Sequence, residues 1–292
     1  MRICNRYLVQ KPLGEGAFSK VFAGKDVLTD QDVAIKFDNS NVKSGKTRRD
    51  LVLYEAAVLT ELHLGGTLKG IPRLHWNGYV TSKSKKEIPL IVIDRLGDDL
   101  ETVITRRKKL SRRETSHIAV ALLDIVQRLH EAGFLHRDLK PANIMLGYSD
   151  LNIYIADFGL AKKYVGTDGK HIAFTDKKSG ITGTLRYCST HTHGNVESSR
   201  RDDLQSLFFI VVYMLQGSLP WQSSQKKKKD PSVESDQRLC VAQMKTSLLY
   251  GKWNDSDLPK SLGQFASDIR QIEFEETPDY DRLRSLLRAI NE

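Results

Sequence analysis

The stretch His136-Arg137-Asp138-Leu139-Lys140-Pro141-Ala142-Asn143, followed by Asp157-Phe158-Gly159, decides the fold of this chain. Two fragments precede it, Gly14-Glu15-Gly16 and Val33-Ala34-Ile35-Lys36. Any one fragment alone could be chance, because Asp and Asn in loops are most often turn formers. In this order, however, they combine a glycine-rich turn, a strand lysine, two potential metal ligands and a base. That combination predicts chemistry on phosphates.

The glycine-rich fragment lies between two strand-like runs, 7–9 and 20–23. A G-x-G pair alone is a weak signal, since most such pairs are simply turns. Between two strands, however, Gly14 and Gly16 allow a hairpin to approach phosphates closely, because they lack side chains and tolerate positive φ. The residues expected to contact ATP are Leu13, Gly14, Glu15, Gly16, Ala17, Phe18, Ser19, Lys20, Val21, Ala34, Lys36, Ile93, Asp94 and Leu96.

Lys36 lies on an alternating run, 32–37, that predicts a strand. It shares a face with the small Ala34, which favours a cation at the ATP phosphates over an ordinary solvated lysine. The next segment, 49–64, has apolar residues at helical spacing, and Glu55 falls on their face. A carboxylate on an apolar face is costly unless it is paired. We therefore expect Glu55, and not the off-face Glu61, to hold Lys36.

Residues 111–133 predict a long buried helix that ends immediately before the catalytic loop. Ser111 and Glu114 form a capping box, and Gly133 ends the helix. In the loop, Asp138 can accept the proton of a substrate hydroxyl, and Lys140 is a further expected catalytic residue. Asn143 and Asp157 supply the hard oxygen ligands that Mg²⁺ prefers. Together these fragments predict transfer of the ATP γ-phosphate to a hydroxyl, with ATP and Mg²⁺ as cofactors.

Composition agrees with a single catalytic unit of 292 residues. The longest apolar run, 207–215, is too short to span a bilayer and predicts the middle of a buried helix. Three scattered cysteines argue against a disulfide framework. No signal sequence is visible, so we expect the protein in the cytoplasm or the nucleus, without membrane association. We also expect a monomer. The net charge of +9 could also indicate nucleic-acid binding, but no nucleic-acid module accompanies it, so no such partner is expected.

Several further motifs closely resemble the casein kinase 1 family of serine/threonine protein kinases. They are Gly159–Tyr164, Gly183–Ser189, Ser199–Leu204, Gly217–Gln222 and Pro278–Tyr280, and the resemblance runs from about Tyr7 to Leu287. Like that family, which has Ser-Ile-Asn there, this chain lacks the Ala-Pro-Glu of most kinases and has Cys188-Ser189-Thr190-His191 in its place. Lys140 is also the residue type of serine/threonine kinases at its position.

Some residues depart from the family pattern. Ser19 replaces a third glycine, Ala142 replaces an aspartate, Thr190 and His191 replace Ile-Asn, and the linker 38–50 is long. These differences indicate a divergent member and leave the catalytic set intact. We expect Thr184 to contact the catalytic loop, in preference to serving as a phosphorylation site.

The resemblance implies an α+β, bilobal protein-kinase fold over 7–287. The expected small lobe, 1–96, is an antiparallel sheet with one helix, and the large lobe, 97–292, is mainly helical. The implied substrates are proteins with acidic or pre-phosphorylated Ser/Thr sites, with Lys178 and Arg186 binding the substrate anion. The run 226–229 is expected to be a solvated loop, with an anion contact or a nuclear address as alternatives. The rival interpretation is a catalytically weak, pseudokinase-like scaffold, but Lys36, Asp138, Asn143 and Asp157 are all present.

Overall fold

The computed structural model describes residues 1–16, 19–38, 51–82, 85–176, 180–222, 231–251 and 258–292. The chain forms two compact units. The first consists of residues 1–98 with 145–160, and the second consists of residues 99–144 with 161–292.

The first unit is built on a six-stranded antiparallel sheet with the order β1-β2-β3-β4-β6-β5. Its strands are β1 (Arg2–Ile3), β2 (Tyr7–Glu15), β3 (Ser19–Asp26), β4 (Gln31–Asp38), β5 (Leu74–Thr81) and β6 (Glu87–Asp94). A smaller sheet has the order β10-β9-β7, with β7 at Leu96–Asp99, β9 at Ile144–Gly147 and β10 at Ile153–Ile155. The unit also holds the helix α1 (Leu51–Leu62) and the short turn η2 (Phe158–Leu160).

The alternation along β4 places different side chains on the two faces of the large sheet. Val33 and Ile35 are fully buried in one core cluster, whose other members are Ile3, Tyr7, Leu90 and Val92. Phe37 packs against this cluster, as the alternating pattern predicted. Ala34 and Lys36 lie on the opposite face and are also buried. The middle of the strand, residues 33–36, is therefore covered on both sides.

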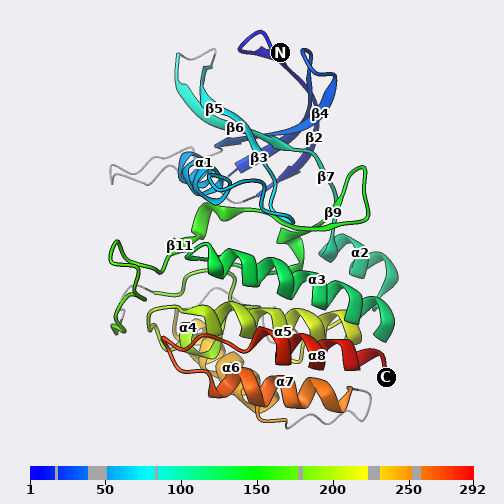
Figure 1. Cartoon of the computed structure of the whole chain (residues 1–292), viewed down its shortest axis with the longest axis vertical. Coiled ribbons are helices and arrows are strands. Elements are labelled where there is room, and N and C mark those ends of the chain that lie inside the picture. The colour runs from blue at the N-terminus through cyan, green and yellow to red at the C-terminus, as the bar shows by residue number, and fades with distance from the viewer. Residues whose placement is uncertain (17–18, 39–50, 83–84, 177–179, 223–230, 252–257) are drawn as a thin grey trace. The chain divides into compact units, whose positions relative to one another are not determined.

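The second unit is mainly helical (Figure 1). Its helices are α2 (Leu100–Arg107), α3 (Arg112–Glu131), α4 (Thr190–His193), α5 (Arg200–Gln216), α6 (Pro231–Leu249), α7 (Lys260–Gln271) and α8 (Tyr280–Arg288). Short 3₁₀ turns occur at η1 (Pro141–Asn143) and η4 (Ala289–Asn291). Strands β8 (Phe134–Leu135) and β11 (Lys162–Lys163) form a two-stranded antiparallel pair.

The local signals in the sequence explain how the two central helices begin and end. Ser111 and Glu114 form the predicted capping box of α3, and Gly133 adopts φ +83° immediately after the helix. In α5, the apolar run from Leu207 onward is buried, which confirms the prediction of a helix in the core. Helices α3 and α5 pack side by side (Figure 1).

An antiparallel sheet in the N-terminal part and helices in the C-terminal part confirm the predicted bilobal protein-kinase fold. Among the described residues, no helix combines the length and apolar character that a membrane span requires.

Candidate active site

Within the first unit, Lys36 is joined to two carboxylates. Its Nζ lies 2.6 Å from Glu55 Oε2 and 2.9 Å from Asp157 Oδ1. Glu55 is buried on α1, whereas Glu61 on the same helix is exposed, as the helical spacing predicted. Burial disfavours the charged ammonium, but the carboxylates of Glu55 and then Asp157 outweigh this effect and raise the pKa of Lys36 above its ordinary value. Lys36 is therefore a fixed positive charge.

The Asp157-Phe158-Gly159 turn is fastened to α1 through the same glutamate. The backbone N–H of Phe158 donates to Glu55 Oε1 over 3.3 Å, and the Phe158 ring is fully buried. Asp157 adopts φ +67°, a left-handed conformation that is uncommon for a residue other than glycine. Its side chain remains nearly half exposed, at 46%. One oxygen is thus held by Lys36 while the carboxylate as a whole stays accessible.

The sheet face that carries Lys36 also gathers the small and apolar side chains expected near the adenine. In the antiparallel ladders, Val21 is opposite Lys36, and Ala34 is opposite Ile93. Residues opposite one another share a face, as do residues two apart along a strand. This face therefore brings together Val21, Ala34, Lys36 and Ile93, four residues predicted to contact ATP.

The β2–β3 hairpin carries the predicted phosphate loop. The pairs Gly14–Val21 and Glu15–Lys20 face each other across it, and Glu15 forms an ion pair with Lys20. Neither Gly14 nor Gly16 has φ in the positive range, so the tolerance of glycine for positive φ is not used here. A Cβ on Gly14 would meet no atom within 4 Å. What glycine provides here is open space beside the backbone.

The Asp94 carboxylate, at the end of β6, ties this strand to the start of β5. It accepts hydrogen bonds from the backbone N–H and the Nε of Arg73 and lies 2.8 Å from His75 Nε2. Despite partial burial, these partners lower the pKa of Asp94 to about 2. The backbone N–H of Asp94 donates to the carbonyl of Arg73. Any contact of Asp94 with an adenine must therefore use atoms other than its carboxylate and its backbone N–H. Leu96 follows at the start of β7.

In the second unit, the Asp138 carboxylate is shared between two neighbours. Lys140 Nζ lies 2.6 Å from Oδ2, and Thr184 Oγ1 donates to Oδ1 over 2.7 Å. Lys140 also donates to Thr184 Oγ1 over 3.2 Å. The predicted contact between Thr184 and the catalytic loop is confirmed. The three side chains form a closed hydrogen-bonded triangle in which the Asp138 carboxylate is positioned and its charge is balanced.

Asn143 is oriented by the same aspartate residue. Its Nδ2 donates to the backbone carbonyl of Asp138 over 2.9 Å, and η1 places it one turn after the base. This bond occupies the amide nitrogen and fixes the direction of the side-chain oxygen. An amide oxygen oriented in this way suits Mg²⁺, which takes few protein ligands and completes its shell with phosphates and water.

Asp203 of α5 holds the catalytic loop in place through its carboxylate. Its buried carboxylate accepts the backbone N–H groups of His136 and Arg137, at 2.8 and 2.9 Å, and lies 3.1 Å from His130 Nε2. Burial opposes ionisation, but His130 and the backbone donors outweigh it and lower the pKa of Asp203. Sequence reasoning did not identify this residue. The only available signal was its place in the Ser199–Leu204 motif.

Comparison with known families agrees with this geometry. The family model described as "Protein kinase domain" matches residues 7–279. The chain belongs to the protein kinase domain family. The kinase domain is a phosphotransferase that acts on proteins, and members of this family generally use ATP and Mg²⁺.

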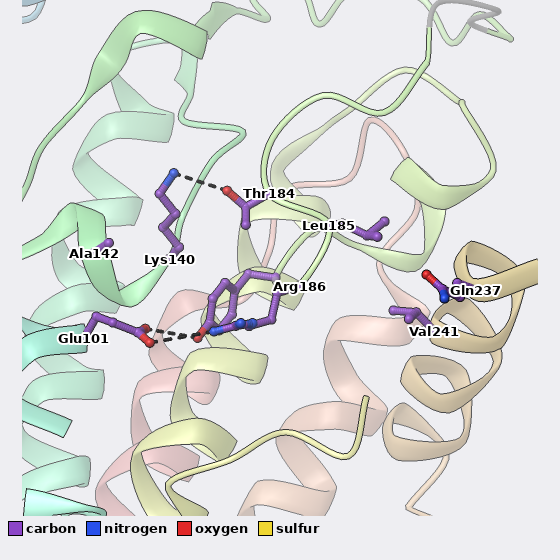
Figure 2. A pocket seen from close by; sticks show the side chains of 9 residues that line it. Glu101, Lys140, Ala142, Thr184, Leu185, Arg186, Gln237 and Val241 are labelled. Carbon is purple, nitrogen blue, oxygen red and sulfur yellow. Dashed lines mark hydrogen bonds and ion pairs between the residues drawn. The ribbon is translucent and has the colours of Figure 1, made fainter. Parts of the chain in front are cut away.

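A pocket of about 560 Å³ lies beside the catalytic loop of the kinase domain (Figure 2). Lys140 and Thr184 contribute to one part of it, and helix α6 contributes another. Its lining residues are Glu101, Lys140, Ala142, Thr184, Leu185, Arg186, Tyr187, Gln237 and Val241. The pocket is thus continuous with the residues that hold Asp138.

Arg186, a predicted substrate-anion residue, lies in this pocket together with an acidic side chain. Arg186 Nη1 is 3.7 Å from Glu101 Oε1, and about a third of each side chain is exposed. Tyr213 and Tyr187 donate their hydroxyls to the two oxygens of Glu101. Sequence reasoning missed Glu101, which is separated from Arg186 by 85 positions and bears no motif of its own. A substrate anion at Arg186 must compete with this carboxylate.

Some predicted residues lie outside the described part of the kinase domain. They are Ala17 and Phe18 in the phosphate loop, Lys178 in the proposed anion site, and the lysine run 226–229.

Proposed function

We propose that this kinase domain is a serine/threonine kinase of the casein kinase 1 type. It transfers the ATP γ-phosphate to Ser or Thr in acidic or pre-phosphorylated protein segments. The observation that carries the proposal is the Asp138–Lys140–Thr184 triangle, in which a lysine two positions after the base bonds both the base and the substrate-side segment. Lys140 is the residue type of serine/threonine kinases, and the Gly183–Ser189 motif that contains Thr184 carries the resemblance.

In this proposal, Asp138 accepts the hydroxyl proton as the substrate oxygen attacks the γ-phosphorus. The bond to the β–γ bridging oxygen breaks, and ADP leaves. Lys140 and Thr184 keep the Asp138 carboxylate oriented and offset its charge. Lys36 stabilises charge on the ATP phosphates, and Glu55 holds Lys36 in place.

The residues present fit a bound magnesium nucleotide. Asn143 and Asp157 would hold Mg²⁺, which supplies neutralisation of charge on the phosphate oxygens. The face with Val21, Ala34 and Ile93 would receive the adenine, since Ala34 leaves space beside apolar neighbours. The open hairpin at Gly14 would let backbone N–H groups approach the phosphates.

The substrate class follows from charge. Arg186 and Lys140 are two cations in the pocket beside Asp138, opposed by Glu101. Ala142 stands where kinases that favour basic substrates often carry a glutamate, so that anchor for arginine is missing. An incoming carboxylate or phosphate forms charge-assisted hydrogen bonds with Arg186. These bonds are stronger than the long contact between Arg186 and Glu101.

A peptide library tests the proposal directly. Peptides that vary in acceptor residue and in the position three before it are incubated with ATP, Mg²⁺ and enzyme, with Asp138→Asn as control. We expect Ser or Thr acceptors, with phosphoserine or aspartate upstream preferred over arginine. Arginine outperforming both would refute the acidic preference. No Asp138-dependent transfer to any peptide would instead support the pseudokinase-like scaffold.

A further inference from the structure

Lys245 is a lysine of α6 with no exposed surface. Within the described part of the chain, its hydrogen-bond partners are carbonyl oxygens, a thiol and an imidazole, and none is a carboxylate. Burying an ammonium is costly unless its donors are satisfied. The catalytic residues described above do not contact it. The arrangement therefore calls for a role beyond packing.

The three N–H donors of Lys245 have three well-placed acceptors. Nζ lies 2.8 Å from the carbonyl of Leu185, 2.5 Å from the carbonyl of Cys188 and 3.2 Å from His193 Nε2. Burial lowers the pKa of His193 to about 4, so its imidazole is neutral at pH 7 and can accept this bond. The ammonium is fully satisfied without a counter-ion.

Two buried aromatic rings complete the surroundings of this ammonium. The Nζ is 5.1 Å from the ring centre of Phe209 and 5.6 Å from that of Trp221. Both distances suit a cation–π attraction. The Trp221 indole also donates to the carbonyl of Arg186 over 2.9 Å. The carbonyls of residues 185 and 188 are thus held by Lys245 of α6, and the carbonyl of residue 186 is held by Trp221, which follows α5.

The segment held in this way lines the pocket beside the base. Thr184, Leu185 and Arg186 line it, and the carbonyls of Leu185 and Arg186 accept hydrogen bonds from the Lys245 ammonium and the Trp221 indole, respectively. On α6, Gln237 and Val241 line the same pocket and precede Lys245 at four-residue intervals, so the three share one helix face. Figure 2 shows Gln237 and Val241 on α6 at one side of this pocket.

We propose that Lys245 is a positioning residue for substrate selection, which fixes the 184–188 backbone and thereby the direction of Arg186. This inference takes the identity of the substrate from the proposed function, whereas the contacts of Lys245 are independent of it. Lys245 should affect the binding of the protein substrate and leave ATP binding unchanged. A compact ammonium with three donors suits this role because it can bind several carbonyls at once.

The test compares Lys245→Met with the parent enzyme in steady-state kinetics. The peptide carries phosphoserine three residues before its acceptor, or is the best library peptide if that preference fails. We expect KM for the peptide to rise about tenfold, roughly the effect of losing one hydrogen bond to a charged group, with KM for ATP within about twofold of the parent. An unchanged peptide KM, or an equal rise for ATP, would overturn the proposal.

Two further variants separate positioning from general damage to α6. Leu248→Ala removes a buried side chain three residues further along the same helix, and it should leave the peptide KM unchanged. A matching rise in this variant would show that Lys245 acts only through helix packing. If Lys245→Met does not fold, Lys245→Gln restores two donors and takes its place. Failure of both variants to fold would assign Lys245 to stability alone and refute the proposal.

The kinetic assay also distinguishes the two levels of inference. A parent enzyme that phosphorylates no peptide contradicts the proposed function. An active parent whose Lys245 variant keeps its peptide KM contradicts the positioning role alone.

Discussion

Gly183 approaches the catalytic loop so closely that a Cβ placed on it would lie 2.4 Å from the carbonyl oxygen of Arg137. Gly183 also adopts φ +89°, and Arg137 itself has φ +66°. Two unusual backbone conformations therefore meet at the point where the segment before Thr184 touches the catalytic loop. Only a residue without a side chain allows this contact.

Gly183→Ala is expected to abolish most activity, because the loop or the segment must shift to relieve the overlap. The matched control is Gly169→Ala, at φ +75°, where a Cβ meets no atom within 4 Å and only the backbone conformation is strained. We expect the control to lose about 1 kcal/mol of unfolding free energy and little activity. Chemical denaturation and peptide phosphorylation measure both effects. Equal activity loss in the two variants would contradict the steric argument.

Asp138→Asn should lower kcat by about 10²–10⁴-fold, because the amide cannot accept the hydroxyl proton. The amide oxygen can still accept from Thr184, so the fold and ATP affinity should stay close to those of the parent. Calorimetry with ATP and Mg²⁺ provides the binding control. Casein phosphorylation at the parental rate would show that the base is misassigned.

Lys36→Met should also reduce kcat strongly, since it removes the cation that Glu55 and Asp157 orient. Glu55→Gln keeps a hydrogen-bonding side chain but removes the charge, and an intermediate loss is expected. Glu61→Gln, on the exposed face of α1, is the matched control and should be neutral. An equal effect of the two glutamine variants would disprove a specific Lys36–Glu55 pair.

Arg186→Ala and Glu101→Gln should change the use of acidic peptides in opposite directions. Arg186→Ala removes the cation, so KM for an acidic peptide should rise. Glu101→Gln removes the carboxylate that competes for Arg186, so KM for the same peptide should fall. Both effects should weaken as salt is added. Arg113→Ala, an exposed change on α3, controls for total charge. KM changes of the same sign in both pocket variants would contradict this model.

The free energy of unfolding should depend on pH through the titration of Lys245. Burial lowers its pKa to about 8, below the ordinary value of 10.5, so the unfolded chain binds more protons between these values. This group therefore makes unfolding free energy increase as pH rises from about 8 toward 10.5. Cys188 titrates with the opposite sign, because burial raises its pKa, but it is present in both parent and variant. Urea unfolding from pH 7.5 to 9.5 should show the difference between parent and Lys245→Met growing with pH, and a constant difference would contradict the shift.

Residues tied to local sequence patterns were predictable. The helical spacing around Glu55 and the capping box at Ser111 both depend on neighbours within one turn, and both appear as expected. The pairing of Lys36 with Glu55 followed from the cost of a buried carboxylate, which holds whatever the rest of the fold does.

Contacts between distant segments were not predictable in the same way. Glu101 reaches Arg186, and Lys245 reaches Leu185 and Cys188, only because α2 and α6 pack against a segment from another part of the chain. Nothing in the spacing of these residues marks them. At Gly14 the structure uses one of the two expected properties of glycine, the missing side chain, and not its tolerance of positive φ.

The attachment of the catalytic loop to Asp203 has a consequence for amide hydrogen exchange. The N–H groups of His136 and Arg137 point to a buried carboxylate on α5, so they exchange only when that helix separates from the loop. Loop amides are ordinarily among the fastest to exchange, yet these two should be as slow as those in the middle of α5. The catalytic loop would then keep its conformation until the hydrophobic core of the second unit unfolds.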